Sequence, residues 1–165
     1  MDLERVCYGC FQEKPDDSPV CPYCGFSAEE EQSFLALPMG TVLGGRYLIG
    51  KVLGVGGFGI TYLGYDLVLE IKVAVKEYMP SGLAVRHADR YQVVLTGHRK
   101  EDYESGMDRF LEEARILAKL QGTSNIVSVQ DYFKENNTAY FVMEYVAGMS
   151  LKAYLTAQGG KIPYD

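Results

Sequence analysis

The chain has 165 residues, 47% of them hydrophobic and 23% charged, which suits one globular domain with a small additional module. Its net charge of −6 lies in residues 1–38, which hold eight acidic and two basic residues, and such a segment repels phosphate backbones, so nucleic-acid binding is disfavoured. No apolar run of about 18 residues predicts a membrane span, and the first residues lack the apolar core of a secretory signal, so we expect a cytoplasmic location.

Four cysteines form two Cys-x-x-Cys pairs near the amino terminus: Cys7, Cys10, Cys21 and Cys24. Each pair makes a tight turn that directs two thiolates to one point, and two pairs complete a tetrahedral sulfur site that suits Zn²⁺. Disulfides, free thiols or a redox site are the alternatives, and the lack of a secretion signal and of a βαβ pattern disfavours them. The segment resembles zinc-ribbon modules, so we expect residues 1–27 to fold around a structural, non-catalytic Zn²⁺.

Composition changes after the last cysteine. Residues 28–45 begin with a Glu-rich run and continue with Pro and Gly, which predicts a linker with at most one short helical turn. The chain is therefore expected to consist of two units joined by this segment.

A glycine-rich turn connects two β-prone runs, residues 47–53 and 60–65. Its glycines are Gly54, Gly56, Gly57 and Gly59. A Gly-x-Gly-x-x-Gly turn lets backbone N–H groups approach phosphate oxygens without obstruction by Cβ atoms. β-Branched and aromatic residues follow the third glycine, which argues against the helix of a dinucleotide fold, and the Gly-Lys-Ser/Thr of a Walker A loop is missing. An ordinary glycine-rich hairpin is the alternative.

A lysine and a glutamate come next in two predicted elements. Residues 71–76 read as an apolar strand that ends in Lys76, whose ammonium needs a partner. Residues 103–122 carry apolar side chains at helical spacing, with Gly122 as the terminator. At about 100° per residue, Glu113 lies at the edge of the apolar face and Glu112 points to solvent. A solvated helix charge is the alternative for either residue.

Two further strands and a helix complete the prediction. Residues 125–133 read as a strand, and the run that starts at residue 138 reads as a buried strand. Ser150 is a plausible N-cap of a helix over residues 151–159. The connection from residue 80 to 103 is unexplained, and His87 and His98 within it are expected to be exposed loop histidines.

This order of motifs resembles the small lobe of bacterial Ser/Thr protein kinases over about residues 40–160. Val73-Ala74-Val75-Lys76 matches the Val-Ala-Ile-Lys strand of that family, and the runs GGFGITY and VKEYMP also fit. The resemblance implies an α+β fold, with a five-stranded antiparallel sheet and one main helix. The implied domains are the small lobe with its hinge over residues 46–149 and the start of the large lobe over residues 150–165.

The resemblance also implies roles for single residues in binding ATP. Lys76 would bind the α- and β-phosphates and pair with Glu113, and Phe58 at the tip of the glycine loop would shield the phosphates. The implied adenine pocket comprises Leu53, Thr61, Ala74 and the gatekeeper Met143, followed by the hinge residues Glu144, Tyr145 and Val146. The backbone of Glu144 and Val146 would hydrogen-bond adenine. Thr61 stands where the family usually has Val, which could alter selectivity.

The family's catalytic loop and Asp-Phe-Gly metal site are missing from the 165 residues. His87-Ala-Asp89 lacks the Arg, and Asp131-Tyr132-Phe133 lacks the Gly. We therefore expect a piece of a longer kinase whose Mg²⁺ ligands lie elsewhere, with weak ATP affinity and no phosphotransfer of its own. The surface that would face a large lobe is expected to favour self-association.

The function predicted for the parent is transfer of the ATP γ-phosphate to Ser or Thr hydroxyls of a protein substrate. The alternative is a non-catalytic kinase-like scaffold or nucleotide sensor whose zinc ribbon binds a partner. Lys76, Glu113 and the glycine loop are all intact, and this favours the enzyme.

Overall fold

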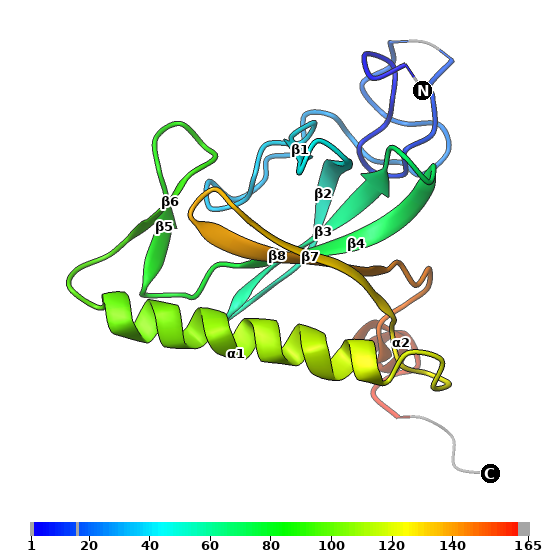
Figure 1. The fold of residues 1–165 in the computed structure, drawn as a ribbon. Coiled ribbons are helices and arrows are strands. Elements are labelled where there is room, and N and C mark those ends of the chain that lie inside the picture. Colours follow the sequence, from blue (N-terminus) through cyan, green and yellow to red (C-terminus); the bar gives the residue numbers. More distant parts are fainter. Residues whose placement is uncertain (1, 16, 162–165) are drawn as a thin grey trace.

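The computed structural model describes residues 2–15 and 17–161 and shows an antiparallel sheet with one long helix lying across it (Figure 1). The sheet has the order β1-β2-β3-β4-β8-β7. Its strands are β1 (Val42–Leu43), β2 (Tyr47–Gly56), β3 (Gly59–Asp66), β4 (Ile71–Tyr78), β7 (Val129–Glu135) and β8 (Thr138–Glu144). A separate hairpin of β5 (Ala84–Arg86) and β6 (Val93–Leu95) precedes α1 (Lys100–Lys119), and α2 (Leu151–Ala157) follows β8. The expected α+β small-lobe architecture is confirmed, and the five expected strands are joined by the very short β1.

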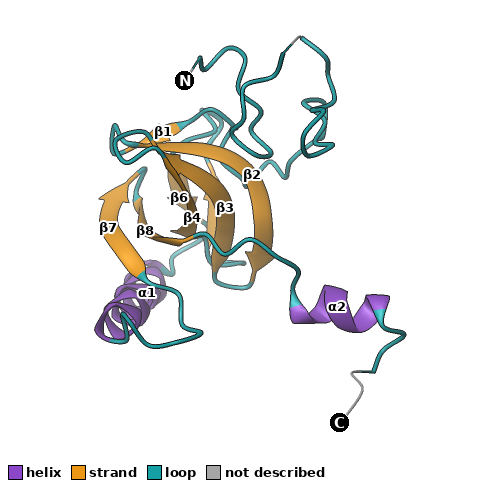
Figure 2. Ribbon diagram, turned by 90° about the vertical axis from the view of Figure 1, so that its right-hand side faces the viewer, coloured by secondary structure: helices purple, strands orange, loops and turns teal. Residues whose placement is uncertain are grey.

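The sheet curls until its two ends meet (Figure 2). Tyr47 at the start of β2 donates a 2.6 Å hydrogen bond from its hydroxyl to Asp131 of β7, and its ring stacks on Phe133 at 5.8 Å. The N–H of Gly44, in the turn between β1 and β2, donates to the Glu135 carboxylate. The β-branched and aromatic side chains inside the curl form the main apolar core.

Helix α1 packs on the sheet through the stripe that its apolar periodicity predicts. Phe110 and Ala114 are buried, and the Phe110 ring contacts Tyr78 of β4 and Phe141 of β8. The helix begins three residues before the predicted start and ends at Lys119, and Gly122 follows in the left-handed region with φ of +84°. Both ends of the observed helix therefore lie closer to the amino terminus than the predicted ends, and the glycine lies beyond the last turn.

Three segments differ from their sequence-based expectations. The strand predicted over residues 125–133 starts only at Val129, since Asn125 adopts φ of +67°, which a strand does not accommodate. The unexplained 80–103 connection forms the β5–β6 hairpin. In the segment predicted as a linker, Ala36, Leu37 and Leu43 are completely buried, because this stretch covers the open end of the core.

The carboxy-terminal helix begins as predicted. The Ser150 hydroxyl oxygen accepts a hydrogen bond from the N–H of Ala153, which satisfies one of the free amides at the start of α2. None of the residues of α2 is buried, and the helix projects away from the sheet (Figure 2). The four last residues of the predicted large-lobe segment lie outside the described residues.

A buried ion pair fastens the β5–β6 hairpin to the sheet. Arg86 donates from Nη1 and Nη2 to the two carboxylate oxygens of Glu77 at 2.8 and 2.6 Å, and both side chains are fully buried. Tyr62 and Tyr140 donate from their hydroxyls to the same carboxylate at 2.6 and 2.8 Å. Burial and the neighbouring Glu77 charge raise the pKa of Tyr62 well above its ordinary value, so this hydroxyl stays protonated and remains a donor.

Replacing one partner of this pair should destabilise the whole domain. Arg86→Leu leaves the Glu77 carboxylate buried without its counter-charge, and we expect the free energy of unfolding to fall by about 3–5 kcal/mol. The measurement is urea unfolding followed by circular dichroism. The control is Arg99→Ala, which removes the exposed Arg99–Asp102 pair and should change stability by less than about 1 kcal/mol. Equal effects of the two substitutions would contradict the prediction.

Candidate functional site

The predicted ion pair between Lys76 and Glu113 is present. The Lys76 Nζ lies 2.7 Å from Oε1 of Glu113, and it also stands over the rings of Phe141 at 5.3 Å and Phe110 at 5.8 Å. The Lys76 side chain is 25% exposed and that of Glu113 is 48% exposed, so the ammonium lies at the edge of the core with one side open to solvent. Since side chains alternate along β4, Lys76 and Ala74 share the face toward α1, and Glu77 points to the other face.

The glycine turn is the tip of the β2–β3 hairpin. An added Cβ would meet no atom within 4 Å at Gly54 and Gly57, so the backbone at both positions is free to approach a ligand. At Gly59 an added Cβ would lie 2.2 Å from the carbonyl oxygen of Glu77, so this glycine is required for the close approach of β3 to β4. The strand packing thus explains Gly59, whereas the open space at the other two glycines suits a bound phosphate.

Two backbone hydrogen bonds hold the tip of the loop. The N–H of Met79 donates to the carbonyl of Phe58 at 3.2 Å, and the N–H of Ser81 donates to the carbonyl of Gly57 at 2.9 Å. The Phe58 side chain itself is 78% exposed. The tip is therefore tied to the segment that leaves β4, with the phenyl ring projecting into solvent.

The residues assigned by resemblance to adenine lie on neighbouring strands. Ala74 of β4 pairs in register with Met143 of β8, and Thr61 of β3 pairs with Lys76. Leu53, near the end of β2, is 41% exposed. Glu144 ends β8, and Val146 lies in the exposed segment that leads to α2. Cross-strand pairing thus places Thr61 beside Lys76 on one side of β4 and Met143 beside Ala74 on the other side.

A cavity of about 480 Å³ lies between the loop tip and α1. Phe58, Lys76 and Glu113 line it, together with Arg99 and Arg109 of the α1 region. Sequence reasoning had not singled out these two arginines. Arg109 lies one helical turn before Glu113, so helical spacing alone could have placed its charge on the side of Lys76.

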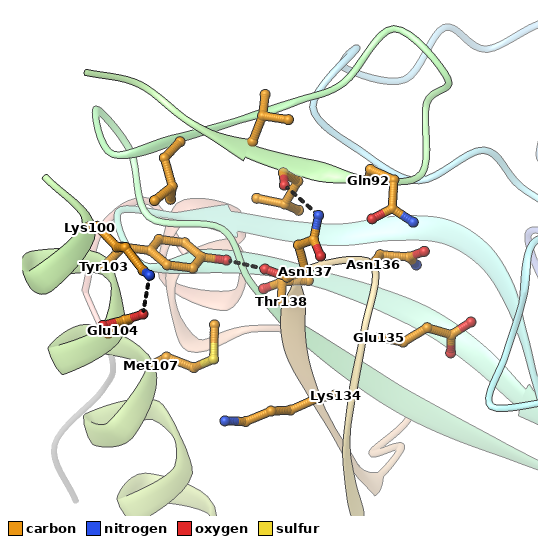
Figure 3. Close-up of a pocket in the computed structure, with 13 residues that line it drawn as sticks. Gln92, Lys100, Tyr103, Glu104, Met107, Lys134, Glu135, Asn136, Asn137 and Thr138 are labelled. Atoms are coloured by element: carbon orange, nitrogen blue, oxygen red, sulfur yellow. Dashed lines mark hydrogen bonds and ion pairs between the residues drawn. The ribbon is translucent and has the colours of Figure 1, made fainter. Parts of the chain in front are cut away.

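A larger cavity, of about 850 Å³, lies along another face of α1 (Figure 3). It is bounded by β6, by Lys100, Tyr103 and Met107 of α1, and by the turn between β7 and β8. None of the residues predicted for ATP lines it. Size therefore does not identify the nucleotide site here, and the ion pair and the glycine loop are the better guides.

The four cysteines converge on one point. Their Sγ atoms all lie within 4.8 Å of one another, with 3.7 Å between Cys7 and Cys24 and 3.8 Å between Cys10 and Cys21. Four sulfurs at about 2.3 Å from a tetrahedral zinc ion are about 3.8 Å apart, so the spacing fits that ion. All four are free of disulfides.

The thiols differ in how readily they ionise. Burial raises the pKa of Cys10 to about 12. Burial also opposes ionisation of Cys21, but the N–H groups of Tyr23 and Cys24 outweigh it and lower the pKa of Cys21 to about 7. A bound cation would supply the positive charge that stabilises the deprotonated form of the other thiols.

A search against protein families matches the protein kinase domain model to residues 47–164. The chain belongs to the protein kinase family. Similar proteins include the serine/threonine-protein kinase PrkC of Bacillus subtilis, 36% identical over 127 residues, which are 77% of this chain and 17% of PrkC. The serine/threonine-protein kinase PksC of Streptomyces coelicolor is 36% identical in an alignment 130 residues long that covers 74% of this chain and 20% of PksC.

A solved structure described as "PpkA-294 apo form" is 38% identical, with a TM-score of 0.68, and the match covers 75% of this chain and 43% of that one. The kinase chain spans about a fifth or less of the length of PrkC and of PksC. The matched region includes the glycine loop, Lys76 and Glu113, while the four cysteines lie before it.

Metal analysis tests the cysteine centre of the kinase chain. We expect one Zn²⁺ per chain by elemental analysis, and we expect Cys24→Ser to lower zinc affinity by at least tenfold because the ion loses one of four sulfur ligands. The measurement is competition with a chromogenic chelator. Tyr23→Ala is the matched control, since Tyr23 is an exposed neighbour that offers no ligand. A chain without bound zinc, or with unchanged affinity in Cys24→Ser, would contradict the assignment.

Proposed function

We propose that this chain is the ATP-binding small lobe of a Ser/Thr protein kinase, whose parent transfers the ATP γ-phosphate to Ser or Thr hydroxyls of a protein. The single observation that carries the proposal is the 2.7 Å contact between Lys76 and Glu113, next to the glycine hairpin. In the family this pair must be in place for phosphoryl transfer. The relatives named above are Ser/Thr kinases, which supports the choice of substrate hydroxyls.

Each residue of the proposed site contributes a distinct interaction. The Lys76 ammonium binds α- and β-phosphate oxygens, and Glu113 orients that ammonium by accepting its hydrogen bond. Backbone N–H groups of the glycine loop approach the phosphates, and the Arg109 side chain adds positive charge to the same cavity, whereas Asp102 balances the charge of Arg99. Ala74 and Met143 form the apolar wall for adenine, with backbone groups of Glu144 and Val146 as its hydrogen-bonding partners.

The remaining parts of the proposal concern organisation. We divide the chain into a zinc-binding module (1–27), a linker (28–45), the small lobe with its hinge (46–149) and the start of a large lobe (150–165). The unpaired thiols and the use of ATP suit the cytoplasm. In the part of the chain that the structure describes, no helix is long and apolar enough to cross a membrane.

We also propose that the chain associates with itself in solution through the surface that would face a large lobe. The glycine loop and the segment that leads into α2 expose several large apolar side chains: Val55, Phe58, Val146, Met149 and Leu151. Exposed apolar groups favour association when they gather in a patch.

Substitution of Lys76 tests ATP binding. Lys76→Met removes the phosphate-binding charge while keeping the length of the side chain, and we expect ATP affinity to fall roughly 10- to 100-fold because a charge-assisted hydrogen bond is lost. Isothermal titration calorimetry with ATP measures it.

Two adjacent glutamates provide a matched comparison. Glu113→Gln should weaken ATP binding about 3- to 10-fold because Lys76 loses its orienting charge. Glu112→Gln should change it less than about twofold, since the ion pair of Glu112 is an exposed one, with Arg115 at 3.5 Å. If both glutamates have the same effect, or if Lys76→Met binds ATP normally, the proposed site is wrong.

Phosphotransfer by the 165 residues themselves is expected to be undetectable. The family's general base and its metal-binding Asp-Phe-Gly are not among these residues, so a bound ATP lacks the groups that activate the acceptor hydroxyl. The assay follows transfer of labelled phosphate from ATP, with Mg²⁺ present, to a Ser-rich protein. Turnover that disappears in Lys76→Met would show instead that this chain is catalytically complete.

A further inference from the structure

The ladder between β2 and β3 is interrupted just before the glycine loop and resumes at Gly54. The register between the two strands shifts between Ile49 and Val52, and again between Val52 and Gly54. Each shift inserts one extra residue in β2, and such bulges free backbone N–H groups from the partner strand. A buried or half-buried amide that loses its ladder partner needs another acceptor.

The amino-terminal segment supplies acceptors for two successive amides in this bulged stretch. The N–H of Lys51 donates to the carbonyl oxygen of Tyr8 at 2.9 Å. The N–H of Val52 donates to Oε1 of Gln32 at 2.6 Å. Tyr8 lies between Cys7 and Cys10, so its carbonyl is part of the turn that the cysteine cluster closes.

Gly50 permits this contact. A Cβ atom on Gly50 would lie 2.4 Å from the Tyr8 carbonyl oxygen and 2.9 Å from Cζ of Phe11. The backbone at Gly50 and at Tyr8 cannot move apart without breaking the hydrogen bond between the Lys51 N–H and the Tyr8 carbonyl. Position 50 therefore requires a residue without a side chain.

An apolar contact reinforces the hydrogen bonds. Val6 and Phe11 form a buried cluster with Leu48 of β2 and Leu63 of β3. Tyr145, in the segment proposed as the hinge, packs against the same cluster. The cysteine segment therefore touches both the strand that leads into the glycine loop and the segment that follows β8.

We propose that the cysteine module, when it holds its metal, positions the glycine loop for ATP through the Tyr8 carbonyl, and that the Gln32 side chain of the adjoining linker supports the same stretch of β2. The metal fixes the Cys7–Cys10 turn, and that turn fixes β2 at Lys51, three residues before Gly54, where the loop begins. Metal occupancy thereby raises the affinity for ATP without any contact between the metal and the nucleotide. This inference rests on the proposed ATP site for its functional consequence, but its structural core does not depend on nucleotide.

Amide hydrogen exchange of the full 165-residue chain tests the structural core. We expect zinc removal by a chelator to speed exchange at Lys51 and Val52 and through the glycine loop by at least tenfold. Amides in the middle of α1, such as those of Leu111 and Ala114, should keep their rates and so show that the domain remains folded. Unchanged exchange at Lys51 in zinc-free chain would overturn the inference.

Variants that keep all four cysteines separate positioning from loss of the fold. Gly50→Ala should speed exchange at Lys51 and weaken ATP binding about 3- to 10-fold even with zinc bound, and chelation should then add little, because the contact is already broken. Gln32→Ala should speed exchange at Val52, and Gln32→Glu, which keeps an acceptor oxygen, should restore it. These variants decide the question even if zinc removal unfolds the whole chain.

The two proposals can fail separately. If Lys76→Met binds ATP as the wild type does, the proposed nucleotide site fails, while hydrogen exchange still tests the role of the module. If ATP binding depends on Lys76 but responds neither to zinc removal nor to Gly50→Ala, the positioning role fails and the nucleotide site stands.

Discussion

Strand β4 carries adjacent charges of opposite sign on its two faces, and each must find a partner. Lys76 points toward α1 and contacts Glu113, whereas Glu77 points into the curled sheet and is held by Arg86, Tyr62 and Tyr140. The first pair fixes the helix relative to the sheet on the side of the proposed nucleotide site. The second fixes the β5–β6 hairpin on the other side. An unpaired charge is costly at the fully buried Glu77, so the docking of the hairpin depends on the partner that this strand finds there.

The two pairs differ in what they contribute. The Arg86–Glu77 pair is sealed from water and fully bonded, so it specifies how the hairpin docks. The Lys76–Glu113 pair is partly exposed and adds little stability by its own Coulomb energy. Its place at a solvent-accessible edge leaves the ammonium within reach of the ligand proposed above. This difference in burial is the physical ground for assigning structure to one pair and chemistry to the other.

Much of the fold could be predicted from the sequence because its signals are local. The glycine hairpin, the amphipathic stripe of α1 and the Ser150 cap each depend on residues close in sequence, and the choice of Glu113 over Glu112 followed from helical geometry. The sequence could not predict the Arg86–Glu77 pair, the β5–β6 hairpin or the burial of Leu37, because these depend on which distant segments cover the core. The cysteine spacing indicated a metal centre but carried no information on the surface against which the module packs.

The bonds at the tip of the glycine loop bear on how a ligand enters. Met79 and Ser81 hold the carbonyls of Phe58 and Gly57, and the segment that provides those two amides continues directly into the hairpin anchored by Arg86. Swinging the tip outward would break both bonds, at a cost of about 1–3 kcal/mol, so an open flap would be a minor population. The position of the loop tip is therefore restrained through the segment that the Arg86–Glu77 pair anchors, and not by the glycines alone.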